Sequence, residues 1–290
     1  MDDRIRARFY QVEEIQEGDA GLYECLHRLW AHQDREDYHE VFGGIWVRLE
    51  RFDSDGGQPG SGFVDGELTR QQNDNIPPIA EQGRPLEGFD RPLGHRCAFR
   101  YHAETRTLLL ESRPNGVTPI RMDGLVKHLL RPHRGFFLSP TLTENALRRL
   151  VEGTPRRVSF RVATPSDMAS VEQSDRTIEE NLTNMANTFG GQSIEVSVGF
   201  PRGQNDSFLN MGAIRRSIEW ATGNRDHVVS YRVKISEEPE PIDIFTEQIK
   251  ISEDAPGISN LDVDVNYDTR RRILREAFNT YLPVIRRTYT

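Results

Sequence analysis

The sequence predicts an α+β protein with a mainly antiparallel sheet, and three observations support this fold class. Stretches that alternate apolar and polar residues, as half-buried strands do, recur along all 290 residues. Residues 96–101 and 107–111 read as two strands on either side of the short turn 102–106 and predict a hairpin. The second half follows the order β-α-β-α-β-β-α, which suits helices packed on one face of an antiparallel sheet.

The first half begins with weak alternation over residues 4–15, which predicts a strand at a sheet edge. Asp19 to Trp30 carries apolar residues at helical spacing, with Asp19 as the expected N-cap. Residues 41–52 alternate as a strand, and 53–66 are rich in Asp, Gly, Ser and Pro, so we expect a flexible loop there. The later elements of this half are an extended segment that leads into Pro77, the hairpin, and a helix over 121–130 that Arg131-Pro132 ends.

The second half begins with a short extended linker at 136–140. We place a domain boundary near residues 132–142, with one α+β domain over 1–135 and another over 136–290. The expected helices are 145–151, 177–189, 214–222 and a basic C-terminal helix over 269–281, and the expected strands are 157–163, 194–200, 228–235 and 242–251.

The composition is typical of a folded protein of the cytoplasm. Hydrophobic residues make up 36% of the chain and charged residues 28%, a polar balance that still leaves enough apolar residues for a core. The longest apolar runs are far shorter than the ~20 residues of a membrane helix. The start, Met1-Asp2-Asp3-Arg4, lacks the apolar region of a secretory signal. Cys25 and Cys97 stand in unrelated contexts, as buried free thiols in a reducing compartment do.

Patterns with known chemistry are few. The sequence has no Cys/His spacing for zinc, no phosphate-binding glycine loop and no nuclease-type Glu-x-Lys, so we expect no catalytic residue, metal or cofactor. Asp262 and Asp264 are spaced as ligands of a divalent cation can be. The alternation of Leu261, Val263 and Val265 around them more simply predicts a strand with an acidic outer face.

The basic residues are almost all arginine, whose planar guanidinium binds phosphate well. The net charge of −8 argues against nucleic-acid binding by the whole surface, so any such binding must come from local clusters of arginine. One cluster combines Arg148-Arg149 with Arg156-Arg157, although solvated helix faces look the same in sequence. The arginines that we expect to contact double-stranded DNA are Arg215, Arg216, Arg271, Arg272 and Arg275.

The most distinctive stretch of the chain is the block 70–131. It reads Arg70-Gln-Gln-Asn-Asp-Asn-Ile-Pro-Pro78, then the hairpin ending in Leu-Leu-Leu-Glu111, then Arg113-Pro-Asn-Gly-Val-Thr118 and a leucine-bearing helix. This pattern resembles a family of uncharacterised bacterial and prophage proteins. The order of elements along most of the chain is similar to that of the RexA-type phage-exclusion proteins.

The resemblance implies an antiphage, abortive-infection role. It implies a homodimer that binds DNA and signals to a second protein of a defence system, which in the RexA case is a membrane effector. It supplies no catalytic residue. Three functions therefore stay open: a non-enzymatic DNA-binding defence protein, an interaction or regulatory subunit without nucleic acid, and a divalent-metal-dependent nuclease with a site around Asp262 and Asp264.

The block 70–131 also contains a candidate surface for a partner or ligand. Short polar side chains ahead of two prolines cap nearby backbone groups, so a structural turn network also accounts for them. Arg70 and Arg113 lie near each other if the hairpin packs under this segment. The residues of the candidate surface are Arg70, Asn73, Asp74, Asn75 and Arg113.

Overall fold

The computed structural model places most of the chain in two compact units. Unit 1 comprises Met1–Ala7, Glu14–Phe136 and Ser252–Phe278, and unit 2 comprises Arg8–Glu13, Phe137–Ile251 and Asn279–Thr290. Strand β1 (Arg4–Glu14) and helix α7 (Val263–Tyr289) contribute residues to both. The structure describes residues 3–289 apart from 17, 43, 56–61, 74–75, 77, 79–83, 85–86, 89–90, 164–175, 190, 192, 201–207, 226 and 237–238.

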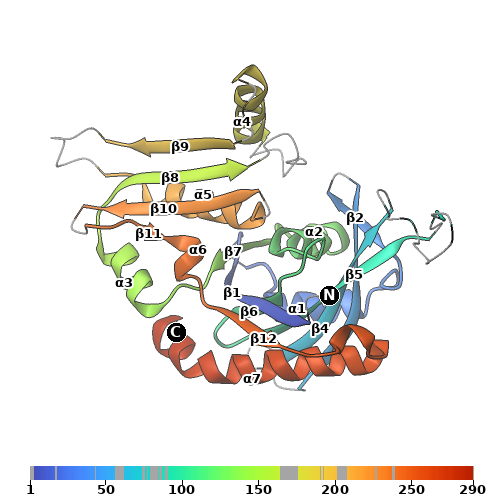
Figure 1. The fold of residues 1–290 in the computed structure, drawn as a ribbon. Helices are drawn as coiled ribbons and strands as arrows, with labels where there is room; N and C mark the ends of the chain where they lie inside the picture. The colour runs from blue at the N-terminus through green and yellow to red at the C-terminus, as the bar shows by residue number, and fades with distance from the viewer. Residues whose placement is uncertain are drawn as a thin grey trace. The chain divides into compact units, whose positions relative to one another are not determined.

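Unit 1 is built around a sheet in which each strand runs antiparallel to the next from β2 to β6 (Figure 1). The strand order is β12-β1-β6-β5-β4-β3-β2, and β7 pairs with β1 outside this path. The bounds are β2 (His39–Phe42), β3 (Ile45–Ser54), β4 (Phe63–Gln72), β5 (Leu93–His102), β6 (Thr107–Glu111), β7 (Phe136–Pro140) and β12 (Lys250–Asp254).

One face of β3 to β6 is apolar and lies against helices α1 (Leu22–Trp30) and α2 (Pro119–Leu129). Strand periodicity sends every second side chain to this face, and the apolar positions of both helices meet it. The buried side chains of this core include Val47, Leu49, Val64, Leu68, Cys97, Phe99, Leu22, Leu26, Leu29, Met122, Leu125 and Val126. A 3₁₀ turn, η2 (Ile258–Asn260), precedes α7.

Unit 2 contains a four-stranded antiparallel sheet with the order β11-β10-β8-β9. Its apolar face carries Val158, Val162, Tyr231 and Val233, which form one core with side chains of the helices. The bounds are α3 (Glu144–Glu152), β8 (Pro155–Ala163), α4 (Arg176–Phe189), β9 (Ser193–Gly199), α5 (Met211–Gly223), β10 (Val228–Ile235), β11 (Ile242–Asp243) and α6 (Ile244–Glu247).

The α+β class with a mainly antiparallel sheet is confirmed. The expected hairpin is β5 and β6, in which Phe99 faces Leu110 and His102 faces Thr107. Periodicity located helices α1 to α5 and α7, because apolar residues recur every three to four positions along them, but it did not locate the short α6. No helix in the described part of the chain has the length and apolar content to cross a membrane.

Several local expectations were wrong. Residues 53–54 of the expected loop 53–66 belong to β3 and residues 63–66 belong to β4, while 56–61 lie outside the described residues. The expected linker 136–140 is β7, which pairs with β1. The expected strand 242–251 is broken by α6, because the Asp243 side chain caps that turn.

The expected cap of the first helix was also misplaced. Gly21 occupies the N-cap position of α1, and the Asp19 carboxylate instead accepts a hydrogen bond from the backbone of Arg134 at 3.1 Å. The side chain that sequence reasoning assigned to a helix end therefore joins two segments of unit 1.

The close approach of β4 to its neighbours predicts that Gly66→Ala destabilises the protein. A Cβ at this position would lie 2.6 Å from the Arg51 carbonyl oxygen and would clash with the Phe99 ring. Overpacking of this kind costs about 1–3 kcal/mol. We expect a lower thermal midpoint by circular dichroism. Gly88→Ala is the control, because a Cβ at Gly88 meets no atom within 4 Å, and equal midpoints for the two variants would contradict the prediction.

Candidate nucleic-acid interface

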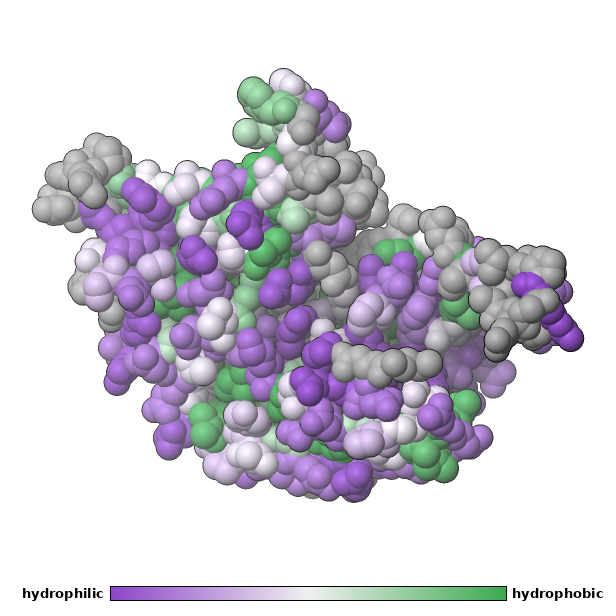
Figure 2. Space-filling view, viewed as in Figure 1, coloured by the Kyte–Doolittle hydropathy of each residue, from purple (hydrophilic) through white to green (hydrophobic). Residues whose placement is uncertain are grey.

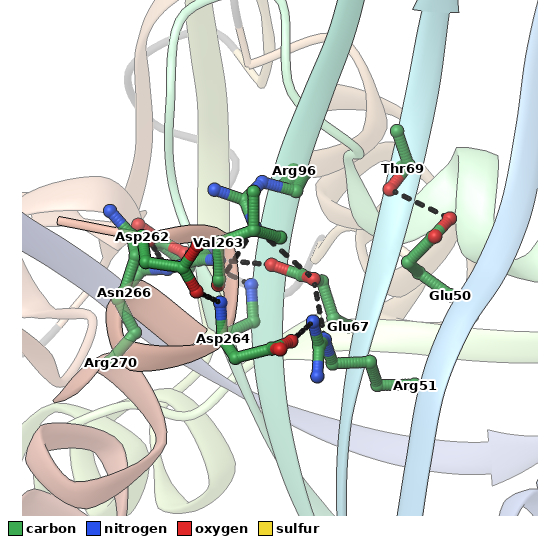
Figure 3. A network of polar contacts seen from close by, with 12 residues as sticks. Glu50, Arg51, Glu67, Thr69, Arg96, Asp262, Val263, Asp264, Asn266 and Arg270 are labelled. Carbon is green, nitrogen blue, oxygen red and sulfur yellow. Dashed lines mark hydrogen bonds and ion pairs between the residues drawn. The ribbon is translucent and has the colours of Figure 1, made fainter. Parts of the chain in front are cut away.

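The second face of the unit 1 sheet is charged, and the first half of α7 covers it (Figure 3). Glu67 on β4 and Glu111 on β6 are 0% and 1% exposed. Asp65 on β4 and Arg100 on β5 are also buried, and the Arg100 guanidinium lies 2.6 Å from the Asp65 carboxylate. Buried charges are tolerated only when they are paired, so each carboxylate of this face needs a cation close to it.

Arg270 of α7 supplies the central cation and is itself 0% exposed. Its guanidinium donates to the Glu111 carboxylate at 2.9 Å, to the Glu67 carboxylate and, at 2.9 Å, to the Asn266 side chain (Figure 3). Burial opposes the charge on Arg270, but the carboxylates of Glu111 and Glu67 outweigh it and raise its pKa. One residue thereby joins β4 and β6 to the helix.

Arg271 neutralises two carboxylates that would otherwise repel each other. Asp53 on β3 lies directly opposite Asp65 on β4, and like charges in facing positions repel. The Arg271 guanidinium pairs with both, at 3.0 Å from Asp65, and Arg275 adds a contact to Asp65 at 3.2 Å. These arginines are therefore held against the sheet.

Asp262 and Asp264 lie at the start of α7, so the expected strand over 261–265 was wrong. The Asp262 side chain accepts a hydrogen bond from the Asp264 backbone at 2.9 Å, as an N-cap residue does, and Asp264 pairs with Arg51 (Figure 3). Local capping thus overrides the alternation of apolar residues. Within the described ranges, no three His, Cys, Asp or Glu side chains are grouped to hold a metal ion.

A cavity of 440 Å³ opens beside this network in unit 1. Its lining includes Trp30, Phe52, Arg51, Arg271 and Tyr267. The Tyr267 hydroxyl is buried, and burial raises the pKa of this phenol. The two arginines in the wall are already paired with Glu67, Asp264, Asp53 and Asp65. The cavity therefore offers a phosphate no uncompensated cation.

Neither cysteine of the chain is a candidate nucleophile. Burial raises the pKa of the Cys25 thiol and of the Cys97 thiol to about 12. Both stay protonated at neutral pH, and a neutral thiol is a poor nucleophile.

The structure brings together part of the candidate surface in the block 70–131. Arg70 on β4 donates to the Asn115 carbonyl at 3.2 Å, in the turn that follows Arg113. Arg113 pairs with the buried Glu111 at 2.5 Å, so it extends the network under α7. Asn73 is exposed just after β4, and Asp74 and Asn75 lie outside the described residues.

The arginines expected to contact DNA fall into different environments. Arg271 and Arg275 are paired with Asp65, as described above. Arg272 is exposed and pairs with Glu276, 3.1 Å away on the same helix face. Arg215 on α5 pairs with Glu13, and its neighbour Arg216 is exposed.

A different basic surface lies in unit 2, on the sheet face opposite the apolar core. We call it the open face and define it by Arg157, Ser159 and Arg161 on β8, Glu195 and Ser197 on β9, and Arg232 and Lys234 on β10. In Figure 1 helix α5 lies behind these strands, and Figure 2 shows hydrophilic residues over β8 and β10 on the side turned to the viewer. The open face is therefore not covered by α5.

The strand register sets the spacing of the open face. Arg157 lies opposite Lys234, and Ser159 lies between Arg232 and Ser197. Arg232 pairs with Asp243 at 3.2 Å, and the Lys234 ammonium donates to the Pro239 carbonyl at 2.7 Å.

Arg157 and Arg161 differ from these neighbours. Both are exposed, and neither has an ion-pair partner among the residues that the structure describes. Sequence reasoning grouped Arg157 with Arg148, Arg149 and Arg156 and missed Arg161. The usable signal was parity: in the stretch Arg157-Val-Ser-Phe-Arg161-Val, the polar residues occupy every second position of a predicted strand.

Neither the comparison with protein-family models nor the comparison with curated proteins found a match for this chain.

The buried network predicts that Arg270→Met strongly destabilises unit 1. Removal of the cation leaves Glu67 and Glu111 buried without it, and breaking a buried pair costs about 3–5 kcal/mol. Denaturant unfolding followed by circular dichroism measures the loss. Addition of Glu67→Gln and Glu111→Gln to the same chain should recover part of the stability, because the uncompensated charges are removed.

Arg272→Met is the matched control for this experiment. Arg272 is on the same helix, is 62% exposed and pairs only with an exposed glutamate, so its loss should change stability by less than about 0.5 kcal/mol. Equal effects of the two substitutions would show that the buried ion pairs do not hold α7 on the sheet.

Proposed function

We propose that this protein is a non-enzymatic antiphage defence protein of the abortive-infection type, which binds double-stranded DNA through the open face and acts on a second defence protein. One observation carries the DNA-binding part. Arg157 and Arg161 are exposed on one strand face and form no ion pair in the described part of the chain, although Glu195 of β9 faces Arg161. The defence role rests on the resemblance of the block 70–131.

The chemistry of the open face favours a phosphate backbone. Two arginines four positions apart on a strand are separated by about 13 Å, given a rise of ~3.3 Å per residue, so they reach different phosphates. Guanidinium groups bind phosphate oxygens in a fork, and Ser159 and Ser197 add hydroxyl donors between them. Side chains of this kind position a protein on DNA without reading its sequence, so we expect weak sequence preference.

The charge of the chain is compatible with this proposal. The net charge is −8, and most of the negative excess belongs to the segments of unit 1. The acidic total limits long-range attraction to DNA. Binding should therefore depend on a few local contacts and be lost at moderate salt.

A second candidate function is that of an interaction subunit without nucleic acid. It is favoured by three aliphatic side chains at the start of α7 in unit 1. Leu261, Val263 and Val265 are 40%, 54% and 51% exposed. Exposed apolar residues in a group are typical of protein-interaction sites. In this case a stoichiometric protein partner would co-purify with a chain that binds no DNA.

The proposal predicts a specific salt dependence. Duplex binding is measured by fluorescence anisotropy across a series of salt concentrations. Each phosphate contact contributes about −0.9 to the slope of log affinity against log salt, so Arg157→Gln with Arg161→Gln should reduce the slope by about 2. Affinity should fall to a similar degree for unrelated DNA sequences, because phosphate contacts are sequence-independent.

Arg28→Gln with Arg131→Gln is the control pair. It removes the same charge from two exposed arginines of unit 1 and should leave the slope unchanged. Absence of duplex binding by the wild-type chain at low salt would exclude DNA binding, and equal losses in the two variants would place the contacts elsewhere.

The defence role has a separate test in cells. Bacteria that express the gene together with its chromosomal neighbours should give fewer phage plaques than cells without it. The variant with Arg157→Gln and Arg161→Gln should restore plaques towards the level of unprotected cells. Full protection by this variant would separate defence from DNA binding by the open face.

A further inference from the structure

Strand β9 forms one end of the four-stranded sheet in unit 2, and among the described strands it pairs with β8 alone. An edge strand presents unpaired backbone N–H and C=O groups, which can bind another strand. Proteins protect such edges with lysine, proline, inward charges or β-bulges. The segment Ser193-Ile-Glu-Val-Ser-Val-Gly199 has no lysine or proline. Its register with β8 runs without a shift from Ala163↔Ser193 to Arg157↔Gly199.

One face of β9 carries apolar side chains, and part of this apolar surface is exposed. Ile194 and Val196 pack partly against the core of unit 2, but Val198 on the same strand face is 54% exposed. Helix α4, which contacts β9, exposes Met185 and Phe189 to 48% and 81%. An unprotected edge that adjoins exposed apolar residues is the surface expected of a strand-pairing interface.

We propose that β9 pairs antiparallel with β9 of a second copy of this chain, about a two-fold axis at Ser197. The sequence of the strand is self-complementary in this register. Val196 faces Val198 of the second copy on the apolar side of the sheet, and Ile194 faces Phe200, which directly follows β9. Glu195 faces Gly199, so no glutamate opposes another, and Ser197 faces itself.

A second copy fits this edge better than an unrelated strand for a further reason. The two-fold axis is perpendicular to the sheet, so each face continues into the same face of the other copy. The helix-covered apolar side meets an apolar side, and the open face meets an open face. The dimer thus forms one sheet of eight strands with the arginines of both copies on one side.

The dimer goes beyond the proposed function, and its formation can be tested in the absence of DNA. Sedimentation velocity of the full chain at micromolar concentration should give a dimer of the 33.3 kDa chain. Val198→Lys places a charge in the interface and should shift the protein to monomer. Val151→Lys is the control, since Val151 on α3 is 69% exposed and away from the strand edge. A monomeric wild-type chain, or a dimer that survives Val198→Lys, would overturn the proposal.

Cysteine cross-linking tests the register. Residues that face each other across an antiparallel pair have Cα atoms about 4.5–5.5 Å apart, within the range that a disulfide spans. Ser197→Cys should therefore form a disulfide-linked dimer under mild oxidation. Cys25 and Cys97 are 0% exposed, and burial raises the pKa of each thiol to about 12, so they give little background.

Ser193→Cys is the matched control on the same strand. In this register two copies of residue 193 lie eight positions apart along the strands, roughly 26 Å, which no disulfide spans. Cross-linking at 197 but not at 193 supports the pairing. Equal cross-linking at both positions, or at neither, would exclude this register, whether or not the open face binds DNA.

Discussion

The ion pairs of Arg270 with Glu67 and Glu111 are the interaction on which unit 1 depends. The sheet has an apolar face that packs against α1 and α2 and a charged face whose carboxylates pair with arginines of α7 as well as of the sheet. Two carboxylates with almost no solvent contact cannot remain ionised without a cation, so the sheet and α7 stabilise each other. The three residues come from distant parts of the chain. Their pairing holds the C-terminal helix on strands that lie much earlier in the sequence.

This network changes the meaning of the arginine count. A cluster such as Arg270, Arg271, Arg272 and Arg275 suggests a basic surface in sequence. In the folded protein Arg270, Arg271 and Arg275 pair with carboxylates of the sheet, whereas Arg272 pairs with Glu276 of its own helix. Arginine suits this internal role because its fork contacts several acceptors at once, as Arg270 contacts Glu67, Glu111 and Asn266. A lysine would offer a single point charge in place of the guanidinium fork.

The sequence predicts the fold class and most elements, because helices and strands of this chain have one apolar face and its period is visible. The prediction fails where one side chain determines the local secondary structure. The Asp262 carboxylate, for example, caps α7, so that the helix begins at Val263. The buried network is harder still, because no periodicity links residues 67, 111 and 270. One signal existed: Glu111 ends the run Thr107-Leu-Leu-Leu, where a charge requires a partner. The open face follows from strand parity, but which arginines lack a partner depends on tertiary contacts.

The two sheets place arginines on strands with opposite consequences, and the cross-strand neighbour makes the difference. In unit 1, Arg100 lies opposite Asp65, and a helix closes over the pair. In unit 2, Arg157 lies between Lys234 and Gly199, and neither neighbour can neutralise it. The first arrangement satisfies its charges internally and makes a rigid support. The second leaves positive charge that must find its counterion in solution or on a ligand. We therefore expect a polyanion to bind the sheet of unit 2, where fewer carboxylates lie near the arginines. Helix α7 has more arginines, but carboxylates already pair with them.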